Sequence, residues 1–313
     1  MSLQRTLLAA SLALPLAALA APFAYVPNEG SATISIIDTA TDQVVGEITV
    51  GKKPRGTVIS TNGKTAYVSD QPNNQLVMVD LVARKATGNI ALGESPEGVG
   101  ISPDGRWVAA AVEETHEVAF IDTRTNKKSF VVKVRGKNPE HAVFSPDGKH
   151  VFVSAEEGEA VNVISMAKRK EVAQIVVGAR PRGIGFTPDG RAAYVAAENS
   201  NEVYVIDAAR FVVLAKIKAG LRSNGITVHP DGKRVFVSNG GDASVSVIDV
   251  ASNTITATIG VGQRPWNMAL TPDGKKLYVA CGRGGVVSVI DTESNTKVTD
   301  ITVGKLPWGV VIR

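Results

Sequence analysis

The chain has 313 residues, of which 44% are hydrophobic and 20% charged, and its formal net charge is +4. Its Lys and Arg residues form no basic stripe interleaved with aromatic residues, which argues against nucleic acid as the main partner. Cys281 is the single cysteine, so an intramolecular disulfide is excluded, and the lack of a C-x-x-C-H sequence excludes covalently attached c-type haem.

The first twenty residues have the pattern of a secretory signal peptide. Arg5 supplies a positive start, Leu7–Leu19 is an apolar run, and Ala18-Leu19-Ala20 is a small-residue cleavage site. We therefore predict a signal peptide at residues 1–20 and one domain at residues 21–313, located in the periplasm or secreted. No membrane span is expected after cleavage, and an uncleaved anchor is the alternative.

A single unit then repeats along the chain, and residues 178–207 show it most clearly. The copies are marked by a Gly-x-x-Pro turn, a Pro-Asp-Gly turn, and a Val/Ile-Asp pair that closes a β run, with Thr61-Asn62-Gly63 as a degenerate second marker and Ser165 in place of one aspartate. The prolines of the first marker recur every 42 or 43 residues, with Ser223 in the fifth slot: Pro54, Pro96, Pro139, Pro181, Pro265 and Pro307. A fixed period of this length, rich in short β runs, is typical of a propeller blade.

The unit that starts at Gly178 predicts four strands. Gly183–Thr187 is an apolar inner strand, and Pro188-Asp189-Gly190 is a hairpin turn that leads into Ala192–Ala196. Glu202–Ile206 alternates apolar and polar residues, and Phe211–Lys216 is the outer strand. One such sheet cannot bury both of its faces, so neighbouring copies must stack around an axis.

The chain begins and ends at different phases of the repeat. Phe23–Val26 matches a second strand and Thr33–Ile37 a third, whereas Trp308–Ile312 matches an inner strand with nothing after it. These segments should therefore form one sheet together, which leaves no open gap in the ring. The length from residue 21 to residue 313 accommodates seven copies. We predict an all-β, seven-bladed propeller of four-stranded antiparallel blades, with the last blade closed by the N- and C-terminal strands.

The residue after the proline slot is the strongest candidate for function, because it varies while its surroundings stay constant. Around the ring it is Arg55, Glu97, Glu140, Arg182, Asn224, Trp266 and Trp308. His141 and Asn267 replace the glycine that otherwise follows, and Arg283 comes from the loop after a second strand. We expect these residues to meet at one mouth of the central channel and to bind a ligand or partner.

Two interpretations of this set remain open. In the first, Trp266 and Trp308 form an aromatic wall, and Arg55 and Arg182 offer forked donors to a carboxylate or quinone-like oxygen. In the second, Arg and Glu pair across a narrow funnel that the Trp rings plug.

No zinc-type histidine spacing or serine nucleophile motif is present, so we predict neither a catalytic set nor a metal site. The acidic pairs Glu113-Glu114 and Glu156-Glu157 are interpreted as a solvated rim, and binding of a hard cation such as Ca²⁺ by their carboxylate oxygens is the alternative.

The repeats resemble a known family. Tyr25-Val26-Pro27-Asn28, Tyr67-Val68-Ser69, Tyr194-Val195-Ala196 and Tyr278-Val279-Ala280, each followed by a V-x-V-I-D-type run, are similar to YVTN-type β-propeller repeats. The exported single-domain layout is most similar to small propeller proteins associated with alcohol catabolism that depends on pyrroloquinoline quinone (PQQ). That resemblance implies a periplasmic accessory role beside a quinoprotein dehydrogenase or its cytochrome, with PQQ or haem as a candidate cofactor.

Three functions are therefore carried forward. The first is a non-catalytic binding or scaffold protein in the periplasm. The second is a hydrolase of the lactonase type found among seven-bladed propellers, in which Arg and Glu would activate water on a lactone. The third is a protein that binds haem d1, with His141 or His116 as the axial ligand.

Overall fold

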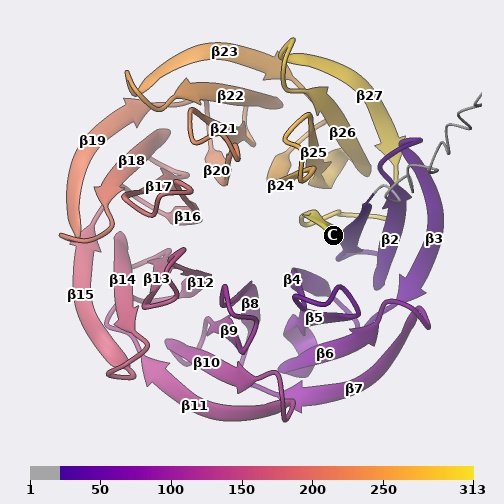
Figure 1. Cartoon of the computed structure of the whole chain (residues 1–313), viewed down its shortest axis with the longest axis vertical. Coiled ribbons are helices and arrows are strands. Elements are labelled where there is room, and N and C mark those ends of the chain that lie inside the picture. The colour runs from indigo at the N-terminus through magenta and orange to yellow at the C-terminus, as the bar shows by residue number, and fades with distance from the viewer. Residues whose placement is uncertain (1–21) are drawn as a thin grey trace, which may run out of the picture.

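The computed structural model describes residues 22–313 and shows seven four-stranded antiparallel sheets around a central channel (Figure 1). The predicted signal peptide lies outside the described residues. Two short 3-10 turns, η1 (Gln71–Asn73) and η2 (Gly282–Gly284), interrupt the strands. In the described part of the chain, no helix is long and apolar enough to cross a membrane.

Each blade contributes one strand to the channel. From blade 1 to blade 7 the inner strands are β28 (Val311–Ile312), β4 (Pro54–Ile59), β8 (Pro96–Ile101), β12 (Pro139–Phe144), β16 (Pro181–Phe186), β20 (Ser223–Val228) and β24 (Pro265–Leu270). The second strands are β1 (Phe23–Asn28), β5 (Thr65–Asp70), β9 (Trp107–Val112), β13 (His150–Ala155), β17 (Ala192–Ala197), β21 (Arg234–Asn239) and β25 (Lys276–Cys281).

The remaining strands complete each blade outward. The third strands are β2 (Thr33–Asp38), β6 (Gln75–Asp80), β10 (Glu117–Asp122), β14 (Ala160–Ser165), β18 (Glu202–Asp207), β22 (Ser244–Asp249) and β26 (Val286–Asp291). The outer strands are β3 (Gln43–Thr49), β7 (Lys85–Ala91), β11 (Lys127–Lys133), β15 (Lys170–Val176), β19 (Val212–Lys218), β23 (Thr254–Gly260) and β27 (Thr296–Thr302). The four predicted strands of the unit that starts at Gly178 are confirmed, with ends displaced by at most two residues.

Ring closure occurs as predicted, in one sheet built from both ends of the chain. Ala24 pairs with Ile312 and Tyr25 with Val311 in an antiparallel register. The backbone N–H of Trp308 donates to the carbonyl of Pro27 over 2.9 Å, which extends the contact beyond the two residues of β28. In Figure 1 the first and last colours of the chain meet in this blade.

The start of each complete inner strand carries a register shift that positions the candidate residues. In blade 5 the pairing jumps from Pro181 to Ile184, so Arg182 leaves the regular ladder. The following glycine brings neighbouring inner strands close together: a Cβ on Gly183 would lie 2.6 Å from the carbonyl oxygen of Asn224. The residue after the proline slot is therefore free to project at the mouth while the backbone behind it is held tightly.

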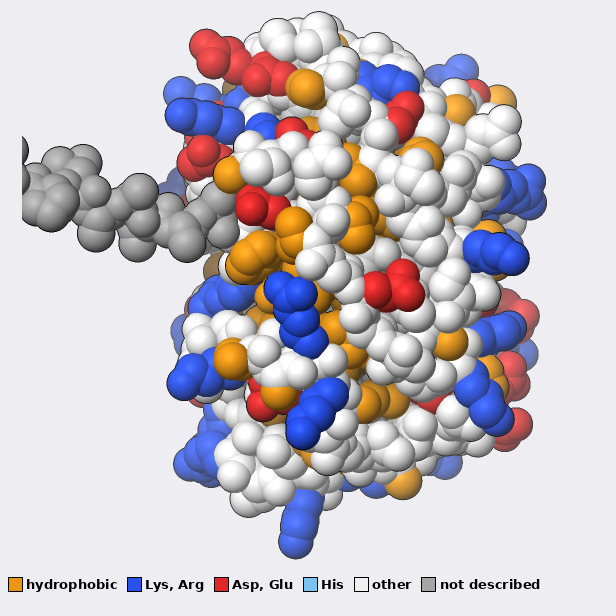
Figure 2. Space-filling view, turned by 90° about the vertical axis from the view of Figure 1, so that its right-hand side faces the viewer, with side chains coloured by type: hydrophobic (Ala, Val, Ile, Leu, Met, Phe, Trp, Pro, Cys, Tyr) orange, Lys and Arg blue, Asp and Glu red, His pale blue; other side chains and the backbone are white. Residues whose placement is uncertain are grey.

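Blades pack through apolar side chains, and several are joined by a tyrosine. The hydroxyl of Tyr67 donates to Asn126 over 2.8 Å, and that of Tyr194 donates to Asn253 over 3.0 Å. Tyr278 donates to the carboxylate of Asp42, which links blade 7 to blade 1. On the side of the disc in Figure 2, basic and acidic side chains are interspersed.

Candidate binding site at the channel mouth

The residues after the proline slot converge at one mouth, because each stands at the start of an inner strand. Two small cavities open there, of about 110 Å³ and 140 Å³. The first is lined by Glu29, Arg55, Glu140, Arg182, Asn224, Arg264, Trp266, Asn267 and Trp308. The second cavity is lined by His141 and shares Arg55, Asn267 and Trp308 with the first. Glu97 is buried beside them, whereas Arg283 is exposed in η2 and lines neither cavity.

Arg55 is held by carboxylates on both sides. Its Nε donates to Glu29 Oε2 over 3.2 Å and its Nη2 to Glu29 Oε1 over 3.1 Å, while Nη1 contacts Glu97. Glu97 also accepts the side-chain N–H of Gln71 over 2.9 Å. The guanidinium is therefore engaged within the protein rather than displayed to a ligand.

Arg182 is more heavily engaged. Its Nη1 contacts both Glu140 and Glu156, and its Nε donates to Glu198 Oε2 over 3.0 Å. Burial opposes its charge, yet these three carboxylates raise the pKa of Arg182 above its ordinary value. For Arg55 and Arg182 the structure thus has the Arg–Glu pairing of the second interpretation.

Two further arginines extend the network, and they were not predicted because they do not follow the proline slot. Arg264 Nη2 donates to Glu198 Oε1 over 2.6 Å, and Arg180 Nε donates to Glu156 Oε2 over 3.2 Å. Both stand one residue before the proline slot, with φ of +57° and +59°. A charged residue in that position of the Gly-x-x-Pro turn was the available sequence signal.

Protonation is shared unequally among the buried acids. Burial, followed by the charge of Glu140, raises the pKa of Glu97 to about 8. The same two causes raise the pKa of Glu156 to about 7. Burial also disfavours the charge of Glu140, but Arg182 and the other cations around it leave its pKa below the ordinary value. Glu140 therefore favours the ionised form, whereas Glu97 and Glu156 keep their protons to a higher pH.

The other half of the mouth is aromatic and amide-lined. Trp266 and Trp308 are half-buried and face the first cavity with Asn224 and Asn267. The Trp308 ring lies 5.5 Å from the His141 ring at 33°. A Cβ added at Gly282 would lie 2.5 Å from the Trp266 ring, so the loop of η2 supports this tryptophan directly. Both Trp side chains line the first cavity, and Trp308 also lines the second.

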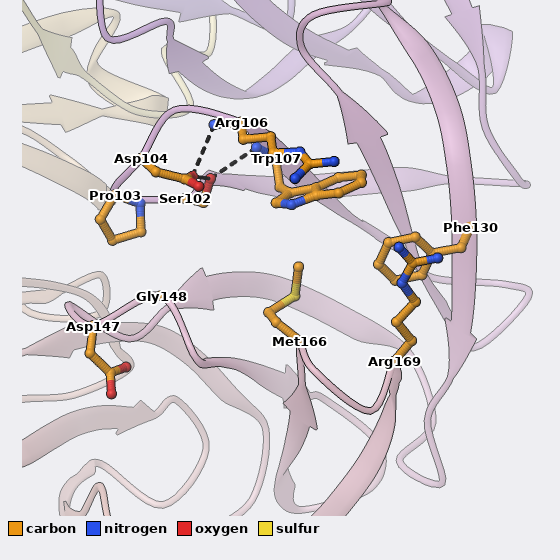
Figure 3. A pocket seen from close by; sticks show the side chains of 10 residues that line it. All are labelled: Ser102, Pro103, Asp104, Arg106, Trp107, Phe130, Asp147, Gly148, Met166 and Arg169. Carbon is orange, nitrogen blue, oxygen red and sulfur yellow. Dashed lines mark hydrogen bonds between the residues drawn. The ribbon is translucent and has the colours of Figure 1, made fainter.

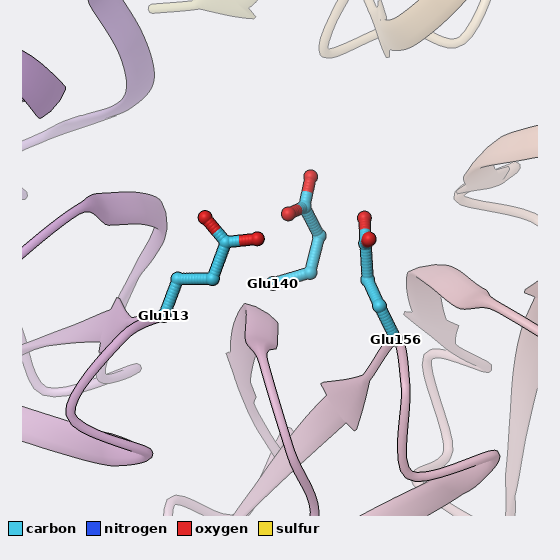
Figure 4. A group of neighbouring side chains, drawn as sticks. All are labelled: Glu113, Glu140 and Glu156. Carbon is cyan, nitrogen blue, oxygen red and sulfur yellow. The ribbon is translucent and has the colours of Figure 1, made fainter.

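The acidic rim prediction is wrong for Glu113 and Glu156. Both are half-buried and point inward, where one carboxylate oxygen of each, with one of Glu140, forms a group lying within 4.8 Å of one another (Figure 4). Glu114 and Glu157 are exposed, as a solvated rim requires. The loops after β9 and β13 thus expose one glutamate of each pair and half-bury the other, which the sequence pattern alone could not resolve.

The two histidines proposed as haem ligands occupy different settings. Burial lowers the pKa of His141, and its ring borders the second cavity. His116 instead caps its own turn: its Nδ1 lies 2.9 Å from the Glu113 carbonyl oxygen and 3.3 Å from the Asn138 backbone nitrogen. His116 is thus a structural residue of the loop.

A larger cavity, about 390 Å³, lies at the other end of the strands between blades 3 and 4 (Figure 3). Trp107, Phe130 and Met166 line it, and the Arg169 guanidinium lies 4.6 Å from the centre of the Phe130 ring. In this blade Ala109 occupies the position that Tyr67 has in blade 2, and stacked Phe120 and Phe130, 4.4 Å apart, fill the space. The cavity is therefore a local variation of blade packing, away from the mouth.

Comparison with solved structures supports the fold. Hydrazine synthase of Kuenenia stuttgartiensis has a TM-score of 0.79 at 21% identity, covering 91% of this chain and 99% of that chain. Dihydro-heme d1 dehydrogenase NirN, in complex with DHE, has a TM-score of 0.71 at 16% identity, covering 95% and 76%. A proposed 6-phosphogluconolactonase of Bacteroides uniformis has a TM-score of 0.80 at 19% identity, covering 93% and 99%. At these identities the likeness concerns the fold alone.

No curated protein matches the chain by sequence. A family model does match, over residues 8–312, which is nearly the whole sequence. The repeat period, the closed ring of seven blades and this match agree, and the chain belongs to the family of YNCE-like beta-propellers.

Proposed function

We propose that this protein is an exported, non-catalytic binding protein that receives a partner at the channel mouth. Its setting would be the periplasm, beside a PQQ-dependent alcohol dehydrogenase or its cytochrome, as the resemblance of its YVTN-type repeats implies. The observation that carries the proposal is the aromatic half of the mouth, where Trp266 and Trp308 present half-buried rings beside Asn224 and Asn267.

Tryptophan rings on a rigid scaffold are well suited to binding, because they bury a large area at low entropic cost. The cavities of 110 Å³ and 140 Å³ are smaller than the roughly 300 Å³ usual for a drug-sized ligand. A side chain or small group projecting from a partner protein fits such a volume. The charged half of the mouth, whose arginines are already paired, would set orientation more than affinity.

PQQ itself does not fit this mouth. It carries three carboxylates, whereas Arg55 and Arg182 are occupied by glutamates and Glu140 stays ionised. Haem d1 does not fit either, because a tetrapyrrole exceeds both cavities even though His141 borders one of them. The accessory role is thus proposed without a cofactor in the propeller.

Lactone hydrolysis remains an unsupported alternative. It would need Arg55 or Arg182 to polarise the lactone carbonyl, and both guanidiniums bind carboxylates instead. Turnover of a lactone panel by the purified protein, abolished by Arg182→Lys, would favour this alternative over the binding proposal.

Binding is tested by surface plasmon resonance with the purified mature chain and immobilised quinoprotein alcohol dehydrogenase or its cytochrome. We expect a micromolar dissociation constant, and at least a tenfold loss in the double variant Trp266→Ala/Trp308→Ala, because aromatic anchors dominate interface energetics.

Trp107→Ala is the matched control, since Trp107 is the third tryptophan and lies at the opposite end of the strands. It should retain the wild-type affinity. Equal affinity of the double variant and the wild type, or no binding to either partner, would contradict the proposal.

A further inference from the structure

Four glutamates gather in the charged half of the mouth. Glu97 and Glu140 come from the starts of β8 and β12, and Glu113 and Glu156 from the loops after β9 and β13. Figure 4 shows Glu113, Glu140 and Glu156 with their carboxylates side by side. One oxygen of each lies within 4.8 Å of the others. Two oxygens bound to one Ca²⁺ can be about 5 Å apart, so a single ion could touch all three.

Glu97 provides a second, independent observation. Its side chain is 1% exposed, and both donors that reach it, from Arg55 and Gln71, bind Oε1. Its Oε2 is buried and has no hydrogen-bond partner among the described residues. The negative charges that act on this carboxyl are those of Glu140 and Glu113. A buried carboxylate oxygen without a hydrogen-bond donor is costly unless a cation or a proton reaches it.

Other oxygens of the group are also free. Glu113 Oε2 accepts the Ser95 hydroxyl over 2.9 Å, and Glu140 Oε1 contacts Arg182. Among residues 22–313, no donor is bonded to Glu113 Oε1 or to Glu140 Oε2.

Positive charge falls short of the four carboxylates. Arg55 and Arg182 are the guanidiniums bonded to Glu97 and Glu140, and each is shared with a further carboxylate, Glu29 or Glu198. Arg180 reaches Glu156 but is likewise shared with Glu198. The site thus combines free carboxylate oxygens with more carboxyl groups than guanidiniums bonded to them.

We propose that Glu113, Glu140 and Glu156 bind one hard divalent cation of the Ca²⁺ class beside the buried carboxyl of Glu97. The ligand set is made of carboxylate oxygens, which suit Ca²⁺, Mg²⁺ or Mn²⁺ rather than thiolate-seeking metals. Ca²⁺ is favoured because it tolerates irregular geometry and accepts water in the remaining positions. The ion would tie blade 3 to blade 4 at the mouth. This inference does not depend on the proposed partner binding by Trp266 and Trp308.

Isothermal titration calorimetry of the chelator-treated mature chain with CaCl₂ tests the site, with MgCl₂ and MnCl₂ titrated in parallel. We expect one site per chain with a dissociation constant on the order of 0.1 mM. At 10 mM CaCl₂ the unfolding temperature should rise by about 4 °C, since the ion binds the folded state alone.

The chain offers matched variants. Glu113→Gln and Glu156→Gln each remove a ligand charge and should weaken Ca²⁺ binding at least tenfold, whereas the exposed neighbours, varied as Glu114→Gln and Glu157→Gln, should stay within twofold. Without calcium, Glu113→Gln should melt at or above the wild-type temperature because it relieves repulsion, which separates a lost ligand from misfolding.

Three results would overturn the inference. One is the absence of saturable binding by all three cations up to 10 mM, which would leave a shared proton to satisfy Glu97. Another is equal weakening by Glu113→Gln and Glu114→Gln, which would indicate diffuse charge attraction. The third is unchanged affinity in both Glu113→Gln and Glu156→Gln.

Discussion

The two ends of a complete inner strand differ in how their polar side chains find partners. At the turn end of β16, Asp189 Oδ1 accepts the Thr187 hydroxyl over 2.6 Å and the Arg191 backbone N–H over 3.0 Å, and Gly190 adopts φ of +70°. Blades 3, 4 and 7 form the same hydroxyl-to-aspartate bond, and blade 2 forms it with Asn62. At the mouth end, Arg182 bonds to three carboxylates from two blades.

The difference shows where each repeat is autonomous and where it is not. A turn closes within one blade, so each copy can satisfy its own polar groups and the same residues recur. The mouth is shared by all blades, so a charge from one blade must be neutralised by its neighbours. The charged residues at the mouth therefore differ from blade to blade and pair with one another, whereas the turn residues repeat because each turn is satisfied within its own blade.

The largest effect is expected from Arg182→Met, which tests this shared neutralisation. Removing the guanidinium leaves Glu140, Glu156 and Glu198 with fewer partners in a buried site. Breaking such a buried network costs about 3–5 kcal/mol. Urea unfolding followed by circular dichroism measures the loss.

Arg191→Met at the turn end is the control. Arg191 is 87% exposed and pairs with Asp189 of its own turn at 3.6 Å. The unfolding midpoint of the Arg191→Met variant should match that of the wild type within error. Equal destabilisation by the two substitutions would show that the mouth network is not special.

An intermediate effect is expected from Tyr278→Phe, which removes a bond between blades rather than within one. Tyr278 donates to Asp42, whereas Tyr194 donates to the neutral Asn253. A hydrogen bond to a charged acceptor is stronger, so Tyr278→Phe should cost about 2 kcal/mol and Tyr194→Phe about 1 kcal/mol in the free energy of unfolding. A reversed order would contradict the assigned role of Asp42.

The same tyrosine predicts sensitivity to alkali. Burial, and then the charge of Asp42, raise the pKa of Tyr278 well above its usual value near 10. The unfolded chain therefore loses its proton first, so this stabilisation is complete below about pH 10 and declines as the pH rises further. The free energy of unfolding, measured at pH 8, 10 and 11, should fall less steeply with pH in Tyr278→Phe than in the wild type.

The smallest effect is expected from Asp189→Asn. Blade 2 already uses Asn62 in the equivalent turn, where its Oδ1 accepts the Lys64 N–H over 3.0 Å and the Ser60 hydroxyl over 2.7 Å. The substitution should change the free energy of unfolding by about 0.5 kcal/mol or less. A loss above 1 kcal/mol, measured by urea unfolding, would mean that the turns are not interchangeable.

Much of the fold followed from spacing. The markers predicted seven blades, the four strands of the unit that starts at Gly178 and the pairing of the chain ends, because turn residues and alternating apolar residues depend on the local backbone conformation. Most candidate site residues also converge: Arg55, Glu97, Glu140, His141, Arg182, Asn224, Trp266, Asn267 and Trp308 all lie at the mouth. Arg283 does not, because the turn of η2 directs it to solvent.

The spacing of the repeats could not predict which residues pair across blades. Glu29 and Arg264 belong to the mouth, although neither follows a proline slot. The inward turn of Glu113 and Glu156, beside outward Glu114 and Glu157, depends on loop geometry at single-residue resolution. A pattern reports how often a residue type recurs, but not which neighbour it meets 42 residues away, as Arg55 meets Glu97 and Arg182 meets Glu140.

By itself, the sequence of this protein determined the repeat, the number of blades and the ring closure, since these depend on backbone hydrogen bonding and on burying the faces of each sheet. Only the tertiary structure decided which charges neutralise one another and which carboxylates remain free. Charge interactions act through space with steep dependence on distance and burial, so they are set when seven separate strand ends are brought to one axis.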